Sequence, residues 1–148
     1  MNRAAKVLIA AVGLAGATIV PSASSSSAAE SCGGSLIWHG VAKDSGRVVG
    51  ALDVYWNGST GTNCAKFSRA GGEFGDYGQG RLTYVRLSTC ATKACTSYIA
   101  QKVDGPRVYA YYAGPVKVGA RNHCVQADGG VYLHGAWRQV GTGTIGCR

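Results

Sequence analysis

The chain has 148 residues and a formal net charge of +8 at pH 7, from 15 Lys and Arg against 7 Asp and Glu. A chain of this length can bury one real core, which argues against a division into several domains. The cations are spread along the chain, so they favour loose attraction to anionic polymers such as wall teichoic acids or nucleic acid. The same spread argues against a defined groove for a specific nucleic acid.

The first 29 residues have the pattern of a secretory signal peptide. Arg3 and Lys6 form a positive start, and an uncharged, mostly apolar run follows at 7–20, ahead of a Ser/Ala tract that ends at Ala29. The apolar run is shorter than the ~20 residues that a spanning helix needs, so we expect cleavage rather than a membrane anchor. We therefore predict one secreted domain at 30–148, with no membrane span after cleavage. Without Arg3 and Lys6 its formal charge falls from +8 to +6.

All six cysteines lie in this secreted part, which indicates disulfides because the number is even: Cys32, Cys64, Cys90, Cys95, Cys124 and Cys147. Six cysteines allow fifteen pairings, and the sequence alone does not choose among them. Cys90 and Cys95 are close enough to close a local turn. Cys32–Cys64 and Cys124–Cys147 would each tie one end of the domain to a neighbouring strand, and we expect this set of three pairs. Zinc is the competing use, but no second close pair stands at metal spacing, so we predict no metal and no cofactor.

The secreted part consists of short β-rich runs separated by glycine, and no segment has the spacing of a long helix. The first strands are expected at 36–38, 48–49, 51–56 and 62–70. Asn57 and Gly58 mark a hairpin turn before the last of these, since this pair tolerates positive φ. Asn57 also begins an N-glycosylation pattern with Ser59, but the turn explains the same residues without modification.

The middle of the chain predicts a surface loop followed by a well-patterned strand. Residues 71–80 are half glycine and lack the Gly-Lys-Ser/Thr ending of a phosphate-binding loop. Residues 82–89 alternate, which places Tyr84, Arg86 and Ser88 on one face of a strand. The cysteine turn at 90–95, a strand at 96–100 and a turn at 104–106 are expected next.

The stretch 108–118 is the richest in β-branched and aromatic residues. We expect two short strands there, joined by a kink at Gly114 and Pro115, because proline cannot donate to a strand ladder. Its three tyrosines are a candidate binding surface, since neighbouring side chains alternate and not all three can face inward: Tyr109, Tyr111 and Tyr112. An outward tyrosine can shield the sheet, or stack on a sugar or another protein.

Three more strands are expected at 124–127, 131–133 and 136–140, with a turn at 128–130 between the first two. The chain then closes at 141–147. About eight short strands at intervals of 8–12 residues predict an all-β fold, either a small antiparallel β-sandwich or a barrel, stapled by disulfides.

Few side chains in the secreted part suit catalysis. A hairpin over the turn at 128–130 would bring His134 to Asp128, as an oriented base or as a surface hydrogen bond. A small nuclease would need an acid–base pair and phosphate-binding cations, and the residues of these types are Glu73, Arg81, Arg86 and His123. Their spacing matches no known pattern, no serine lies in a Gly-x-Ser-x-Gly elbow, and oxidised cysteines leave no thiolate. We expect a protein that is not an enzyme.

Five short motifs stand in one order along the secreted part. They are Cys32-Gly33, the segment from Tyr55 to Cys64, the segment from Tyr112 to Val116, Cys124-Val125 and Gly146-Cys147. Together they resemble the spore-associated protein A family of small secreted actinobacterial proteins, over essentially the whole secreted part.

The resemblance implies an exported, disulfide-bonded β domain at the spore or aerial-hypha surface, and it brings no catalytic residues. The family pattern has four cysteines, which leaves Cys90 and Cys95 as additions and favours their pairing with each other. We expect a non-enzymatic secreted protein of the spore or cell envelope, with a cell-wall or spore-surface polymer as its partner. The alternatives are a secreted protein that binds cell-wall glycan or antagonises a competitor, and then a small secreted hydrolase.

Overall fold

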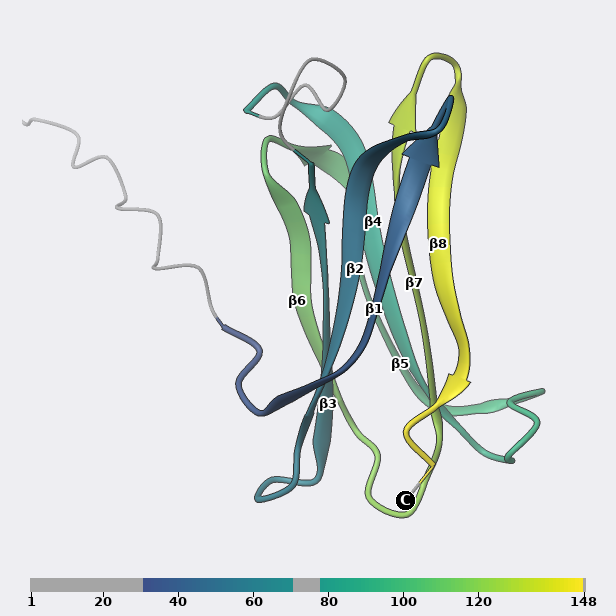
Figure 1. Cartoon of the computed structure of the whole chain (residues 1–148). Helices are drawn as coiled ribbons and strands as arrows, with labels where there is room; N and C mark the ends of the chain where they lie inside the picture. The colour runs from purple at the N-terminus through teal and green to yellow at the C-terminus, as the bar shows by residue number, and fades with distance from the viewer. Residues whose placement is uncertain (1–30, 71–77, 148) are drawn as a thin grey trace, which may run out of the picture.

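The computed structural model describes residues 31–70 and 78–147. The predicted signal peptide, Glu73 and most of the predicted glycine-rich loop lie outside the described residues. The described chain has eight strands and no helix, and hence no helix long and apolar enough to span a membrane (Figure 1). The strands are β1 (Ser35–Asp44), β2 (Arg47–Asn57), β3 (Thr62–Arg69), β4 (Arg81–Cys90), β5 (Tyr98–Tyr109), β6 (Tyr112–Gly119), β7 (Val125–Leu133) and β8 (Ala136–Ile145).

The strands form two antiparallel sheets that face each other. Sheet A has the order β1-β2-β3-β6, and sheet B has the order β5-β4-β7-β8. β1 lies beside β8 at one edge, and β6 packs against β4 and β5 at the other (Figure 1). The predicted all-β class is confirmed, and the two separate sheets make the fold a sandwich rather than a barrel.

The core lies between the two sheets and is built around the ring of Phe67, which is fully buried. A Cβ atom at Gly50 of β2 would lie 2.4 Å from this ring, and one at Gly129 of β7 would lie 2.8 Å from it. The ring therefore fits because two facing strand positions carry no side chain. Leu52 and Leu87 are among the largest side chains buried around it.

Three disulfides lie at one end of the sandwich, in the pairing expected from the sequence: Cys32–Cys64, Cys90–Cys95 and Cys124–Cys147. The first ties the start of the domain to β3. The other two lie next to each other, where the backbone N–H of Cys90 donates to the carbonyl of Cys124 over 2.9 Å.

The hairpin between β2 and β3 is confirmed, but its turn differs from the one expected. Asn57 pairs with Thr62, and the N–H of Gly61 donates to the Asn57 carbonyl at 2.9 Å. The Asn57 side chain accepts from the backbone N–H of Ser59 at 3.1 Å. Positive φ falls at Gly61, not at the Asn57–Gly58 pair. The glycine that the turn needs is therefore the last residue of the loop.

Two of the predicted turns lie inside strands. β5 continues through the expected turn at 104–106, where its pairing with β4 shifts register and Gly105 has a φ of 93°. β7 runs through the expected turn at 128–130, and the chain reverses instead at His134 and Gly135. In each case the glycines serve close packing within a strand rather than a chain reversal.

The tyrosine-rich stretch is divided between the two sheets, and its break does not lie at Gly114 and Pro115. The break falls at 110–111, and Gly114 and Pro115 lie inside β6, an edge strand where proline is tolerated. The buried Arg69 holds this break, because its Nη1 donates to the carbonyls of Tyr109 at 3.0 Å and Ala110 at 3.3 Å.

Candidate functional site

The outer face of sheet B gathers the polar and aromatic side chains that the fold leaves uncovered. In β4, Val85 and Leu87 are buried in the core, so Tyr84 and Arg86 point away from it. Arg86 lies opposite Asp128 of β7. We call the outward side chains of these four strands the sheet B face: Leu82, Tyr84, Arg86, Ser88, Tyr98, Gln101, Val103, Val108, Gln126, Asp128, Tyr132, Trp137, Gln139 and Thr144.

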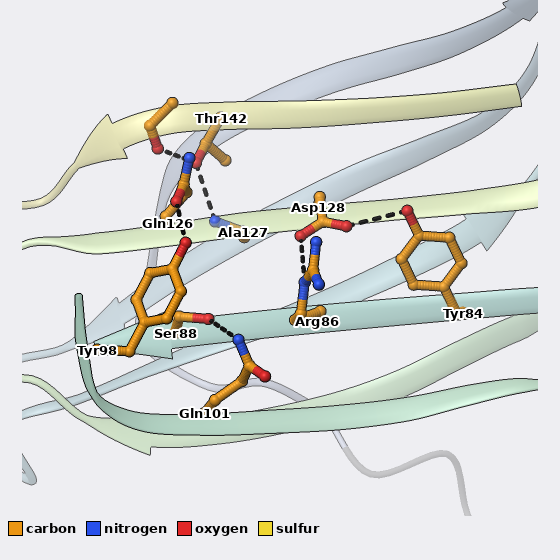
Figure 2. Close-up of polar contacts among 10 residues, drawn as sticks. Tyr84, Arg86, Ser88, Tyr98, Gln101, Gln126, Ala127, Asp128 and Thr142 are labelled. Carbon is orange, nitrogen blue, oxygen red and sulfur yellow. Dashed lines mark hydrogen bonds and ion pairs between the residues drawn. The ribbon is translucent and has the colours of Figure 1, made fainter. Parts of the chain in front are cut away.

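Asp128 is the centre of the polar part of this face. The Tyr84 hydroxyl donates to its Oδ2 at 2.9 Å, and the Arg86 Nε donates to its Oδ1 at 2.7 Å, so both carboxylate oxygens are bound (Figure 2). Burial, with the charge of Asp128, raises the pKa of Tyr84. The hydrogen bond to Asp128 raises the pKa of Arg86. Both donors therefore keep their protons at neutral pH.

Two further hydrogen bonds run across the strands beside Asp128. Tyr98 of β5 donates to the Gln126 Oε1 at 2.8 Å, and the Gln101 Nε2 donates to the Ser88 hydroxyl at 2.9 Å (Figure 2). These contacts hold the side-chain amides in one orientation. A ligand would therefore meet polar groups that have already lost much of their freedom.

The aromatic part of the face is centred on Trp137 of β8, and we call Trp137, Tyr84 and Tyr132 the Trp137 aromatic group. The Trp137 ring meets Tyr84 edge-on at 5.2 Å and 81°, and it meets Tyr132 at 5.6 Å and 69°. Gly130 lies beneath this group: a Cβ there would lie 2.8 Å from the Arg138 carbonyl oxygen and 3.2 Å from the Tyr84 ring. The glycine thus lets Tyr84 of β4 lie across β7 toward β8.

Two shallow hollows on the face join these two parts. One of about 370 Å³ includes Tyr98, Gln126 and Asp128 in its lining, and one of about 340 Å³ includes Tyr84 and Trp137. Arg86 and Gln139 line both. The two hollows are therefore neighbours, and the face can hold an extended ligand with one polar and one aromatic end.

The three predicted tyrosines lie elsewhere, and the structure brings only two of them together within the described residues. Tyr109 packs against the core, and its hydroxyl donates to the Asp104 carboxylate. Burial, followed by this contact, raises the pKa of Tyr109 to about 12. Tyr111 and Tyr112 line a separate hollow with Lys66, whose Nζ lies 4.1 Å from the Tyr112 ring centre.

The predicted pairing of His134 with Asp128 is wrong. The His134 Nδ1 donates to Asp44 Oδ2 at 2.6 Å, and the Arg138 Nε lies 2.8 Å from Asp44 Oδ1. The hydrogen bond from His134 lowers the pKa of Asp44. Asp44 ends β1 and is 5% exposed, so this cluster joins the edges of the two sheets. Asp128 is unavailable to His134 because β7 does not turn there.

The groups considered for a nuclease are not brought together. Arg86 is paired with Asp128, whereas His123 lines a hollow of about 350 Å³ at the disulfide end, with Lys93 and Asn122. Within 31–70 and 78–147, no group of three or more His, Cys, Asp or Glu side chains is placed to hold a metal ion.

Sequence reasoning missed Trp137, Asp128 and Gln126 as members of one site. The alternation at 82–89 placed Tyr84 and Arg86 on one face, but it did not identify the strands beside them. Comparisons of the chain with protein-family models, curated proteins and solved structures found no match.

Proposed function

We propose that this chain is an exported, non-enzymatic protein of the spore or cell envelope that attaches to an envelope polymer through the sheet B face. The family resemblance supports the location, and three disulfides suit an oxidising compartment. The single observation that carries the attachment is the Tyr84–Asp128–Arg86 network, which continues directly into the Trp137 aromatic group.

This network suits binding better than proton transfer. A general acid or base works best when its pKa lies near the working pH. Tyr84 and Arg86 instead have raised pKa values, so they keep their protons and donate hydrogen bonds to the Asp128 carboxylate. Groups fixed in one protonation state supply constant donors and acceptors to a ligand.

A small hydrolase is the second candidate, and one observation favours it. His134 has its Nδ1 bound to the Asp44 carboxylate while its side chain is 64% exposed, which is the orientation that a catalytic base needs. His134→Ala should abolish cell-wall hydrolysis if this reading is correct. Under the binding proposal, the same variant leaves attachment to the wall unchanged.

The test is co-sedimentation of the oxidised secreted domain with purified cell wall and with washed spores, in low and high salt. Pelleting that survives high salt and is lost on disulfide reduction supports a formed site. Pelleting that vanishes in high salt would mean that net charge alone causes attachment. No pelleting in either salt would contradict the proposed function.

A further inference from the structure

We infer that the sheet B face recognises an uncharged polysaccharide, with sugar rings against the Trp137 aromatic group and hydroxyls on the amides beside Asp128. This inference rests on the proposed function and names the chemical class of the polymer. It is unexpected for a domain with a formal net charge of +6 at 30–148, which would by itself favour a polyanion.

The charges on the face cancel locally. Among the described strand residues, the outward positions of sheet B carry one cation, Arg86, and one anion, Asp128, joined at 2.7 Å. The alternation turns Lys102, Arg107 and Arg138 to the opposite side of their strands, where their register partners are the inward residues of β4 and β7. A polyanion would therefore meet an Arg86 that is already paired, beside a carboxylate that repels it.

The remaining polar groups match sugar hydroxyls, which both donate and accept. Gln126, Gln101 and Gln139 each carry an amide with both functions, and Tyr98 carries a hydroxyl. The Ser88 hydroxyl is buried and serves to hold Gln101. The hydrogen bonds from Tyr98 to Gln126 and from Gln101 to Ser88 orient Tyr98, Gln126 and Gln101 before a ligand arrives. An uncharged ligand rich in hydroxyls can form hydrogen bonds with all of these groups, whereas an apolar ligand would leave them without hydrogen-bond partners.

The aromatic group supplies the other half of sugar recognition. Trp137, Tyr84 and Tyr132 offer apolar ring surface with polar edges, which suits the C–H face and the hydroxyl rim of a pyranose. The hollows of about 370 and 340 Å³ adjoin through Arg86 and Gln139. Both are shallow, so neighbouring units of one chain can occupy them while the polymer continues past the site.

The experiment measures co-sedimentation of the disulfide-intact protein with insoluble cellulose, chitin and β-1,3-glucan, and retention on immobilised dextran sulfate, in low and high salt. At least one uncharged polysaccharide should retain the protein in high salt. Trp137→Ala should weaken this retention at least tenfold and leave dextran sulfate retention unchanged. Tyr112→Ala is the matched control, because Tyr112 is an aromatic on the outer face of sheet A, and it should change neither.

Thermal unfolding of each variant separates loss of the site from loss of the fold, and Gln139→Ala provides a second variant outside the aromatic group. Failure to bind any of the uncharged polysaccharides, with cell-wall pelleting intact and dependent on Trp137, would overturn this inference and leave the proposed function standing. Cell-wall pelleting unchanged in Trp137→Ala would overturn both. Retention on dextran sulfate alone, removed by salt, would replace the uncharged class with a polyanion.

Discussion

The two outer faces of the sandwich differ in how they present charge. The outer face of sheet A carries Lys43, Lys66 and Lys117 at exposed or half-buried positions, with one carboxylate, Asp53, bound by His39 at 2.6 Å. The outer face of sheet B is neutral through the Arg86–Asp128 pair. Under the proposed function, long-range attraction and close recognition would therefore lie on opposite faces.

This separation has a physical consequence for binding. Attraction by exposed lysines is screened beyond about 8 Å at physiological ionic strength, so it brings a polymer near without fixing its position. Hydrogen bonds and ring contacts on the sheet B face act at contact distance and depend little on salt. We therefore expect high salt to remove the attraction by the lysines. Mutations on the sheet B face should remove the binding that remains in high salt.

The largest effect is expected from filling the space beneath the Trp137 aromatic group. In Gly130→Ala, the new Cβ would lie 2.8 Å from the Arg138 carbonyl oxygen and 3.2 Å from the Tyr84 ring, so backbone and ring must move. We expect a loss of about 1–3 kcal/mol in the free energy of unfolding, together with loss of polysaccharide binding. Denaturant unfolding and co-sedimentation measure the two effects. Gly119→Ala on β6 is the control, since nothing lies within 4 Å of its Cβ position.

The next effect concerns Asp44, which lies between the edges of the two sheets. The folded pKa of Asp44 is lowered by the His134 hydrogen bond, so its contribution is present above the ordinary carboxyl pKa. That contribution is lost as the pH falls through the lowered pKa. Asp44→Asn should therefore reduce the melting temperature at neutral pH, and the difference from the unmodified chain should shrink in acid. A difference that persists unchanged in acid would contradict this role.

Asp53 provides the matched control for this experiment, because it is paired with His39 on the open outer face of sheet A. An exposed pair of this kind contributes about 0–1 kcal/mol. Asp53→Asn should therefore change the melting temperature less than Asp44→Asn at the same pH.

A moderate effect is expected from Asp128→Asn, which removes the charge that balances Arg86. The sheet B face then becomes positive and resembles the sheet A face. We expect uncharged polysaccharide to bind about tenfold more weakly, since two charge-assisted contacts are weakened. Dextran sulfate retention in low salt should increase. Unchanged retention of both polymers would show that the ion pair has no part in selectivity.

The smallest effect is expected from the double variant Lys66→Ser and Lys117→Ser. Retention on dextran sulfate in low salt should fall a few-fold, because each exposed lysine adds little to the attraction. Binding to uncharged polysaccharide in high salt should not change. A loss of that binding would place the recognition surface on sheet A.

Much of the framework could be predicted from the sequence because it depends on local patterns. The alternation at 82–89 identified β4, Asn57 marked the β2–β3 hairpin, and the near pair Cys90 and Cys95 indicated its own disulfide. Each of these features involves residues that are close in the chain.

The site could not be predicted because it depends on two strand glycines whose roles are tertiary. Gly129 and Gly130 form a pattern typical of a turn, but Gly129 makes room for Phe67 in the core and Gly130 makes room for Tyr84 outside. The strand order then places β7 between β4 and β8, which brings Asp128 to Arg86. Neither packing partner is near in the sequence, so no local signal distinguishes these glycines from a turn.

The measurement that tests the central claim most directly is co-sedimentation of Trp137→Ala and Tyr112→Ala with purified cell wall in high salt. If the sheet B face is the attachment surface, the Trp137 variant stays in the supernatant while the Tyr112 variant pellets like the unmodified chain. Equal pelleting of the two folded variants would contradict the claim.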